Sequence, residues 1–214
     1  MCTMMCVLGL TTTAQEHSFE DYFYPFAFRT FISQNSEGKT TSMCQFSFAS
    51  ESFDNYLIEE TYIGMGIMSA KTIYRYHTEG NAVISDVQLR QNAITGSTKY
   101  QDKITLFAFP NDDKPYTWTE TDCGDTYQCT SENVYINASI FQHSFFTKAI
   151  RITRDNSYVY KNEKHRIIET SYWVSDYGRI VTYIDWDGTK NAIKLDVLDY
   201  FQEISEEEYN KLKK

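Results

Sequence analysis

The strongest constraint on the fold is a two-residue alternation of side chains that runs through most of the chain after residue 70. In the segment 165–175 the two faces alternate residue by residue, with Ile168, Thr170, Tyr172 and Val174 on one and Ile167, Glu169, Ser171 and Trp173 on the other. Segments 103–109, 146–152 and 179–186 share this period. A period of two is typical of a half-buried β-strand.

Turn signals separate these alternating segments. Gly, Asn, Asp and Pro, the residues that tight turns favour, gather at 78–81, 110–115, 123–126, 154–157, 175–178 and 185–188. Connections this short cannot hold parallel crossovers, so the strands should pair antiparallel. Aromatic residues make up 16% of the chain, and they favour pleated surfaces. We therefore expect a mainly β fold, an antiparallel meander of about eight to ten strands forming an open barrel or a two-layer sandwich.

Helices are expected at two places. Ser205 followed by three glutamates forms a capping box, which predicts a short C-terminal helix. Residues 18–26 could begin a short helix, but Pro25 and the dense aromatics fit a strand equally well. The apolar stretch 62–68 fits a fully buried strand. No composition break divides the chain, so residues 15–214 are expected to form a single β-rich domain.

The first fourteen residues, 1–14, resemble a secretory signal peptide. The stretch is apolar and uncharged, and Thr12 and Ala14 supply small residues before polar Gln15. It lacks a basic start, so a buried N-terminal strand is the alternative. Cleavage after Ala14 would place the protein in the periplasm or outside the cell. The apolar run is too short to span a bilayer, and the sequence predicts no transmembrane segment.

Three cysteines remain after such a cleavage. Cys123 and Cys129 flank a Gly-Asp turn signal, and two strands leaving that turn could bring the thiols into bridging range. The sequence thus predicts a Cys123–Cys129 disulfide, with two unpaired cysteines as the alternative. Cys44 fits a small buried residue in an alternating strand.

Charge and motifs exclude several classes of function. The net charge of −9 provides no basic surface for a nucleic-acid backbone. No nucleophile, dinucleotide, phosphate-loop or zinc pattern occurs, so the sequence implies no catalytic residues, no metal and no cofactor. The segment 185–191 resembles a calcium loop only loosely, since its glycine falls fourth rather than sixth. A hairpin turn at Asp187-Gly188 explains it better.

Two sets of residues remain as candidates for chemistry or binding. His165 and Glu169 share a strand face and could form an acid–base pair, although a polar stripe on an outer face explains them as well. Aromatic side chains could stack on sugars or line an apolar pocket, or they could form the core. The candidate ligand-binding residues are Trp118, Tyr172, Trp173, Tyr183 and Trp186.

One family resemblance arises in the second half of the chain. The segment 172–181 has the form YW-x-x-x-x-G-x-[IV], and residues 106–110 with the later Trp118 have the form LxxxP…W. In these motifs the chain resembles uncharacterised exported β-sheet proteins of Bacteroides-type bacteria. The resemblance implies an envelope or secreted location and an open, barrel-like or sandwich β fold. It carries no catalytic residues.

Three functions follow as hypotheses. The first is an exported, non-enzymatic β scaffold that binds a small apolar molecule or an envelope protein. The second is a glycan-binding protein or a glycan hydrolase with Glu169 as the acid. The third is a structural or assembly protein of the cell envelope.

Overall fold

The computed structural model describes residues 19–23, 28–48, 56–63, 67–92, 94–111, 114–122 and 125–213. The signal peptide expected at 1–14 lies outside these residues. The described strands are β1 (Phe28–Gln34), β2 (Thr40–Phe48), β3 (Tyr56–Ile63), β4 (Ile67–Glu79), β5 (Ala82–Asn92), β6 (Thr98–Ala108), β7 (Tyr116–Asp122), β8 (Asp125–Ile140), β9 (His143–Tyr160), β10 (Glu163–Val174), β11 (Gly178–Trp186), β12 (Thr189–Leu195) and β13 (Leu198–Ile204). The two helices in the described part are α1 (Phe19–Phe23) and α2 (Glu206–Leu212).

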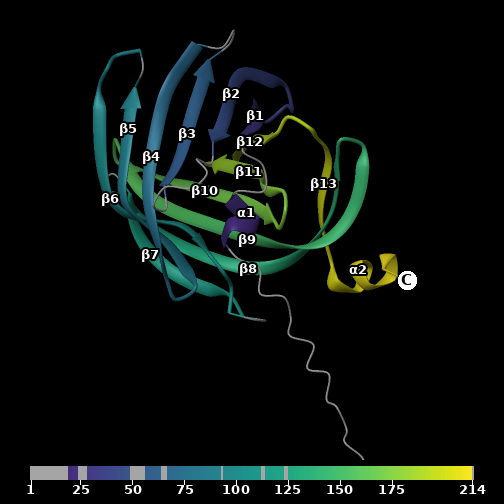
Figure 1. Ribbon diagram of the computed structural model, residues 1–214. Coiled ribbons are helices and arrows are strands. Elements are labelled where there is room, and N and C mark those ends of the chain that lie inside the picture. Colours follow the sequence, from purple (N-terminus) through teal and green to yellow (C-terminus); the bar gives the residue numbers. More distant parts are fainter. Residues whose placement is uncertain are drawn as a thin grey trace, which may run out of the picture.

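The strands form one antiparallel sheet that curls into a half-barrel around α1 (Figure 1). Its order is β13-β8-β9-β10-β11-β12-β1-β2-β3-β4-β5-β6, and β7 also pairs with β8. The predicted antiparallel β meander and the open-barrel alternative are thus confirmed. The described part holds thirteen strands rather than eight to ten, and β1, β2 and β3 lie before residue 70, outside the region from which the alternation was read.

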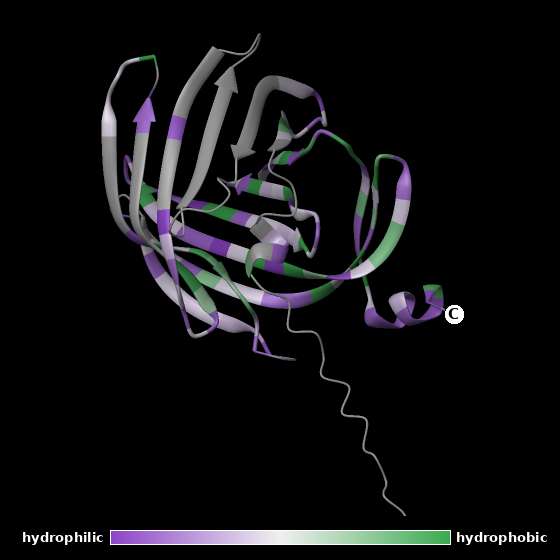
Figure 2. Ribbon diagram, viewed as in Figure 1, coloured by the Kyte–Doolittle hydropathy of each residue, from purple (hydrophilic) through white to green (hydrophobic). Residues whose placement is uncertain are grey.

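The long strands β8 and β9 lie next to each other in the sheet, and β7, β10 and β13 pair with them. They have 16 and 18 residues and pair from Gln128↔Asp155 to Ile140↔His143 without a register shift. Along them, hydrophobic residues are interspersed with hydrophilic ones (Figure 2). The edge of β8 that faces away from β9 is shared by two strands, with β7 on residues 125–131 and β13 on residues 135–140.

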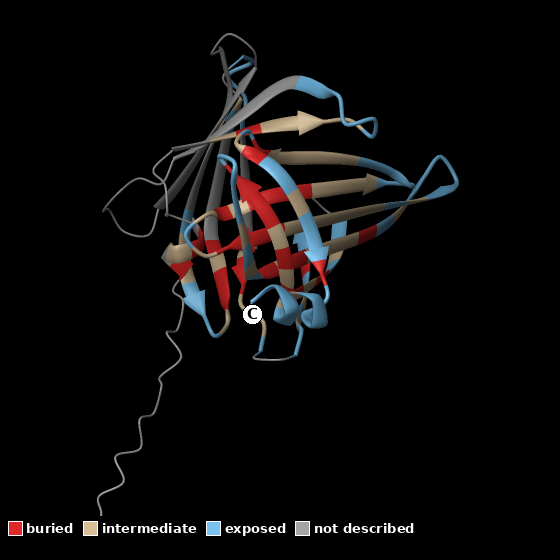
Figure 3. Cartoon of the chain, turned by 90° about the vertical axis from the view of Figure 1, so that its right-hand side faces the viewer, coloured by how far each residue is buried: buried red, intermediate tan, exposed pale blue. Residues whose placement is uncertain are grey.

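Two hydrophobic clusters lie on opposite faces of β8 and β9. The first cluster holds Val134, Ile136, Ala138 and Ile140 of β8, together with Phe31, Ala149, Tyr172, Val174, Ile180, Val181, Leu195 and Leu198. The second cluster lies inside the half-barrel, where α1 packs, and holds Phe19, Tyr22, Val83, Phe107, Ile150, Ile152 and Trp173. Figure 3 shows buried residues concentrated in the middle of the strands and exposed ones at the hairpin tips. Burial on both faces therefore fixes the register of β8 and β9.

The predicted turn at 154–157 is wrong, because these residues lie inside β9. Asp155 pairs with Gln128 on one side and Ile168 on the other, and its carboxylate accepts hydrogen bonds from the Arg166 guanidinium. Hydrogen bonds to the neighbouring strands thus satisfy the polar groups of residues that would otherwise favour a turn. The turns at the two ends of β9 are Phe141-Gln142 and Lys161-Asn162, which take positive φ angles without glycine.

Three other local predictions are confirmed and one is wrong, while the burial predicted for Cys44 lies outside the described side chains. The C-terminal helix α2 is capped by Ser205, whose Oγ accepts from the Glu208 amide at 3.1 Å. The N-terminal alternative resolves to helix α1, and Asp187-Gly188 forms the β11–β12 turn. The stretch 62–68 is not one strand: Ile63 ends β3 and pairs with Ile67 at the start of β4.

Candidate functional site

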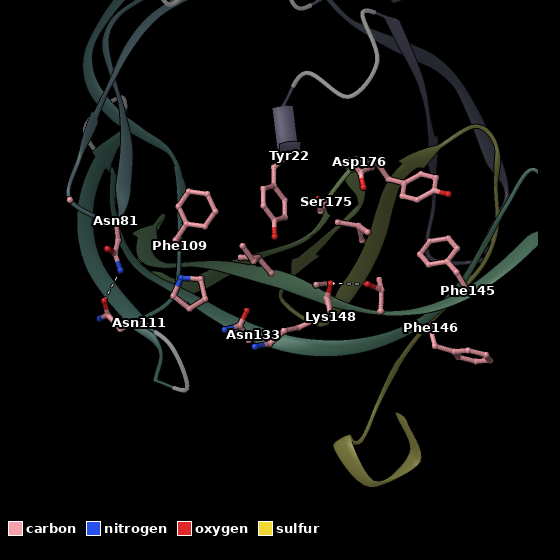
Figure 4. A pocket seen from close by; sticks show the side chains of 17 residues that line it. Tyr22, Asn81, Phe109, Asn111, Asn133, Phe145, Phe146, Lys148, Ser175 and Asp176 are labelled. Carbon is pink, nitrogen blue, oxygen red and sulfur yellow. Dashed lines mark hydrogen bonds between the residues drawn. The ribbon is translucent and has the colours of Figure 1, made fainter. Parts of the chain in front are cut away.

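A groove of about 1250 Å³ that could hold a ligand opens where β9 continues past the end of β10 (Figure 4). The last pair between these strands is Trp173↔Ile150. Beyond it, β10 turns away at Val174, whereas β9 continues to His143 beside β8. The lining residues come from α1, the β4–β5 turn, the segment after β6, β8, β9 and the β10–β11 turn.

One wall of the groove is made by two chain segments that hold each other. Asn81 Nδ2 donates to Asn111 Oδ1 at 2.6 Å, and the Phe109 amide donates to the Asn81 carbonyl at 2.7 Å. The turn before Asn81 needs Gly80, whose φ of +59° is in the left-handed region. These bonds fix the Phe109 ring against Tyr22, at a centroid distance of 5.7 Å.

The opposite wall is formed by α1 and the turn that joins β10 to β11. The Asp176 amide donates to the Asp21 carbonyl at 2.8 Å, which ties this turn to the helix. The rings of Phe145 and Tyr177 stack at 5.0 Å with their planes 4° apart. Burial, followed by the nearby charges of Asp21 and Asp176, raises the pKa of Tyr22 to about 12. Tyr22 therefore presents a neutral phenol at neutral pH.

The floor of the groove belongs to β8 and β9. Asn133 and Ile150 lie opposite each other in the register, and Lys148 follows two residues further along the same face of β9. Lys148 and Phe146 are exposed, and Phe146 retains 38% of its accessible surface. Among the described lining residues Lys148 is the one cation and Asp176 the one anion. The groove thus combines aromatic rings with amides and two charges.

The five aromatic residues expected to bind a ligand do not line this groove. Tyr172 and Trp173 point to opposite faces of β10 and belong to different hydrophobic clusters. Trp118 packs against the second cluster and Tyr183 against the first, while Trp186 is 51% exposed. The structure therefore does not bring the five together, and their role in binding stays a prediction.

Two arginines of β9 organise the charged groups, one on each face. Arg151 binds Glu132 and Glu203 at 2.7 Å each, and Glu203 also accepts a hydrogen bond from the Tyr172 hydroxyl at 2.8 Å. Arg154 binds Glu120, whose side chain is only 5% exposed, and Glu169 at 3.1 Å. Glu120 further accepts from Trp118 Nε1 and the Thr105 amide, both at 3.3 Å, which joins β6 to β7.

His165 and Glu169, which share a strand face, do not pair with each other. His165 Nδ1 lies 2.6 Å from Asp187 Oδ2 and its ring stacks on Tyr158, whereas Glu169 binds Arg154. His165 thus contacts Asp187 while Glu169 pairs with Arg154, and neither residue lines the groove. The expectation of an acid–base pair is corrected, because cross-strand neighbours at closer range take both side chains.

The described residues test the predictions for the cysteines and for metal binding only in part. Cys129 is buried in β8 and forms no disulfide with any described residue. Cys123 lies outside the described residues, so the disulfide stays a prediction. Within the described ranges no group of three metal-ligating side chains comes together. No helix among those residues is long and apolar enough to cross a membrane.

Sequence reasoning missed the groove, although it located part of the wall. Asn81 and Asn111 fall in two of the segments identified as turn signals, but nothing local indicated that these two turns meet. Asn133 and Lys148 occupy ordinary polar positions of alternating strands. Their importance depends on where β10 ends relative to β9, and the sequence carries no local signal for that.

Comparison with known proteins gives two structural relatives. No protein-family model and no curated protein matches the chain. A predicted lipoprotein from Parabacteroides distasonis matches with a TM-score of 0.44 and 7% identity, over 80% of this chain and 94% of the other. A predicted exported protein with a YmcC-like fold from Bacteroides fragilis matches with a TM-score of 0.43 and 8% identity, over 84% and 99%. Both similar structures come from Bacteroides-type bacteria, the group named in the sequence resemblance.

Proposed function

We propose that this chain is an exported, non-enzymatic binding protein whose ligand lies in the groove beside β9. The observation that carries the proposal is the groove itself, in which Tyr22, Phe109 and Phe145 supply rings while side-chain amides supply donors and acceptors. Binding sites typically combine a largely apolar lining with a few fixed polar groups. The uncharged segment 1–14 with its small-residue exit supports the exported location.

The groove is large enough for a ligand bigger than a compact small molecule. Sites for compact small molecules usually measure about 300 to 1,000 Å³, and this groove exceeds that range. Its walls are also well fixed, since the Asn81–Asn111 bond and the bond from Asp176 to Asp21 hold the segments on either side. A preformed site avoids the cost of ordering its walls when the ligand arrives.

The test measures binding of three probes to the purified mature chain by isothermal titration calorimetry. Palmitate represents a lipid, cellohexaose a glycan, and a mixture of extended heptapeptides a protein partner. We expect at least one probe to bind. The variant Lys148→Trp, which fills the groove, should weaken that binding about tenfold or more.

The matched control is Lys164→Trp, which places the same side chain on the exposed β10 end outside the groove. It should leave the affinity unchanged. The proposal is contradicted if none of the three probes binds the wild-type chain, or if Lys148→Trp binds as tightly as Lys164→Trp.

A further inference from the structure

The groove is bordered by a strand edge that no other described strand covers. We call residues His143–Ala149 of β9 the open edge, because β8 pairs with them on one side while the β10 pairing stops at Ile150 on the other. An uncovered strand edge presents backbone N–H and C=O groups that can pair with another chain.

The hairpin turns determine which backbone groups face the groove. The two-residue Phe141-Gln142 turn, with both φ angles positive, makes Ile140 and His143 a hydrogen-bonded pair. Alternation then directs the backbone groups of Phe145, Thr147 and Ala149 toward β8. Those of Ser144, Phe146 and Lys148 point the other way, toward the groove.

The second hairpin gives the same assignment independently. The Lys161-Asn162 turn makes Tyr160 and Glu163 a hydrogen-bonded pair, and counting back along β9 directs the backbone of Ile150 toward β10. Neither β8–β9 nor β9–β10 contains a register shift. At the open edge the Lys148 carbonyl accepts one long hydrogen bond, 3.4 Å from the Thr147 hydroxyl.

We propose that the open edge binds an extended peptide segment of a partner protein, which adds to the sheet as a strand beside β9. This inference rests on the proposed function and names its ligand class. Main-chain hydrogen bonds supply affinity in this mode of recognition, and pockets for alternate side chains supply specificity. Here the rings of Phe109 and Tyr22, which contact each other, and of Phe145 and Tyr177, which stack, offer aromatic surfaces for those side chains.

Charge indicates the composition of the peptide. Lys148 forms no ion pair with any described residue, and it lies on the face of β9 that also carries Phe146 and Ile150. A peptide strand paired with β9 would place one of its side chains directly opposite Lys148. An acidic residue at that position, with apolar neighbours, is therefore the complementary sequence.

The walls argue against a second copy of this chain as the occupant. Tyr22, Asp176 and Asn111 stand around the groove and leave its interior open (Figure 4). A single extended segment can lie between such walls. A complete sheet edge from another copy would bring neighbouring strands and turns that meet them.

The test uses the acetylated and amidated heptapeptide Thr-Val-Thr-Glu-Thr-Val-Thr as its probe. N-methylation at every second residue should weaken binding about tenfold in one set of positions and change it by less than about twofold in the other. Only a strand that directs alternate amides toward β9 gives this two-residue pattern. Equal effects at all positions would overturn the proposal.

Substitutions in the protein test the same strand pairing that the modified peptides test. Lys148→Pro removes an N–H that faces the groove and no bond to β8, and it should weaken peptide binding about fivefold. Lys148→Ala removes the charge but retains the N–H, so comparing it with Lys148→Pro separates the contribution of the charge to peptide binding from that of the backbone N–H. Val159→Pro is the matched control: Val159 lies opposite Lys164 of β10, but the β8 pairing ends at Asp155, so the variant removes an N–H that faces away from β10 outside the groove.

The remaining outcomes separate this inference from the proposed function. If palmitate or cellohexaose binds the groove and the heptapeptide does not, the proposed function stands and the peptide inference fails. If no probe binds, both fail. Self-association in analytical ultracentrifugation that Lys148→Pro abolishes and Val159→Pro retains would overturn the inference in favour of a second copy.

Discussion

Two adjacent segments of β9 share one strand and one alternation, yet they meet different surroundings. The closed segment, residues 150–155, pairs with β8 and with β10, whereas the open edge, His143–Ala149, pairs with β8 alone. The closed segment carries Arg151 and Arg154, each held by two carboxylates on its own face. The open edge carries Phe146 and Lys148 at the groove. One strand therefore supplies stability in one segment and, in the function that we propose, a binding surface in the next.

The largest expected effect comes from Glu120, which holds Arg154 in the closed segment. Glu120→Ala leaves a largely buried arginine with one carboxylate fewer and removes the acceptor of Trp118 Nε1. We expect the free energy of unfolding to fall by about 3 to 5 kcal/mol, as measured by urea denaturation.

The matched control is Glu132→Ala on the other face. Glu132 is 31% exposed, and its removal leaves Arg151 bound to Glu203. A loss of about 1 kcal/mol is expected. Equal losses for the two variants would contradict the view that the Glu120–Arg154 pair stabilises the fold more than the Glu132–Arg151 pair does.

A second pair of variants compares the two segments on the same strand face. Ile150 is 3% exposed and packs in the second cluster, whereas Phe146 is 38% exposed. Ile150→Ala should lower the free energy of unfolding by about 2 to 5 kcal/mol. Phe146→Ala should change it by less than about 0.5 kcal/mol. A large loss of stability for Phe146→Ala would show that the open edge is part of the core.

A smaller effect is expected from the Cys129 thiol, which lies beside the closed segment opposite Arg154. Burial, followed by the Glu120 carboxylate, raises its pKa from 9.0 to about 12. The folded chain therefore keeps this proton where the unfolded chain has lost it, so stability falls as the pH rises from 9 toward 12.

Thermal unfolding across that range checks the expectation. Cys129→Ala should show a smaller fall in Tm between neutral pH and about pH 11 than the wild-type chain. Part of the fall should persist, because burial also raises the pKa of Tyr22 to about 12. An identical pH profile in the variant would show that the thiol does not contribute.

The strands and the C-terminal helix could be predicted because their signals are local. Alternation such as that of Tyr172 and Trp173 fixes which residues face each side, and Ser205 with its following glutamates fixes a helix start. The turn expected at 154–157 is wrong because these residues pair on both sides within the sheet, and Arg166 of the next strand binds Asp155. No local pattern reports such a partner.

The groove could not be predicted for a related reason. It exists because β10 leaves β9 at Ile150 and because the turn at Gly80-Asn81 meets Asn111 from another strand pair. Both facts concern the placement of strands relative to each other. The aromatic excess was visible, but the same residues serve both clusters as well as the groove.

The central claim is that β9 has an unpaired edge facing the groove, and amide hydrogen exchange measured by NMR on the ligand-free chain tests it most directly. The amides of Ser144, Phe146 and Lys148 should exchange about a hundredfold faster than those of Phe145, Thr147 and Ala149. Residues 150–155 should be protected at every position. Equal protection of Phe146, Thr147 and Lys148 would mean that another strand covers this edge, and would contradict the account.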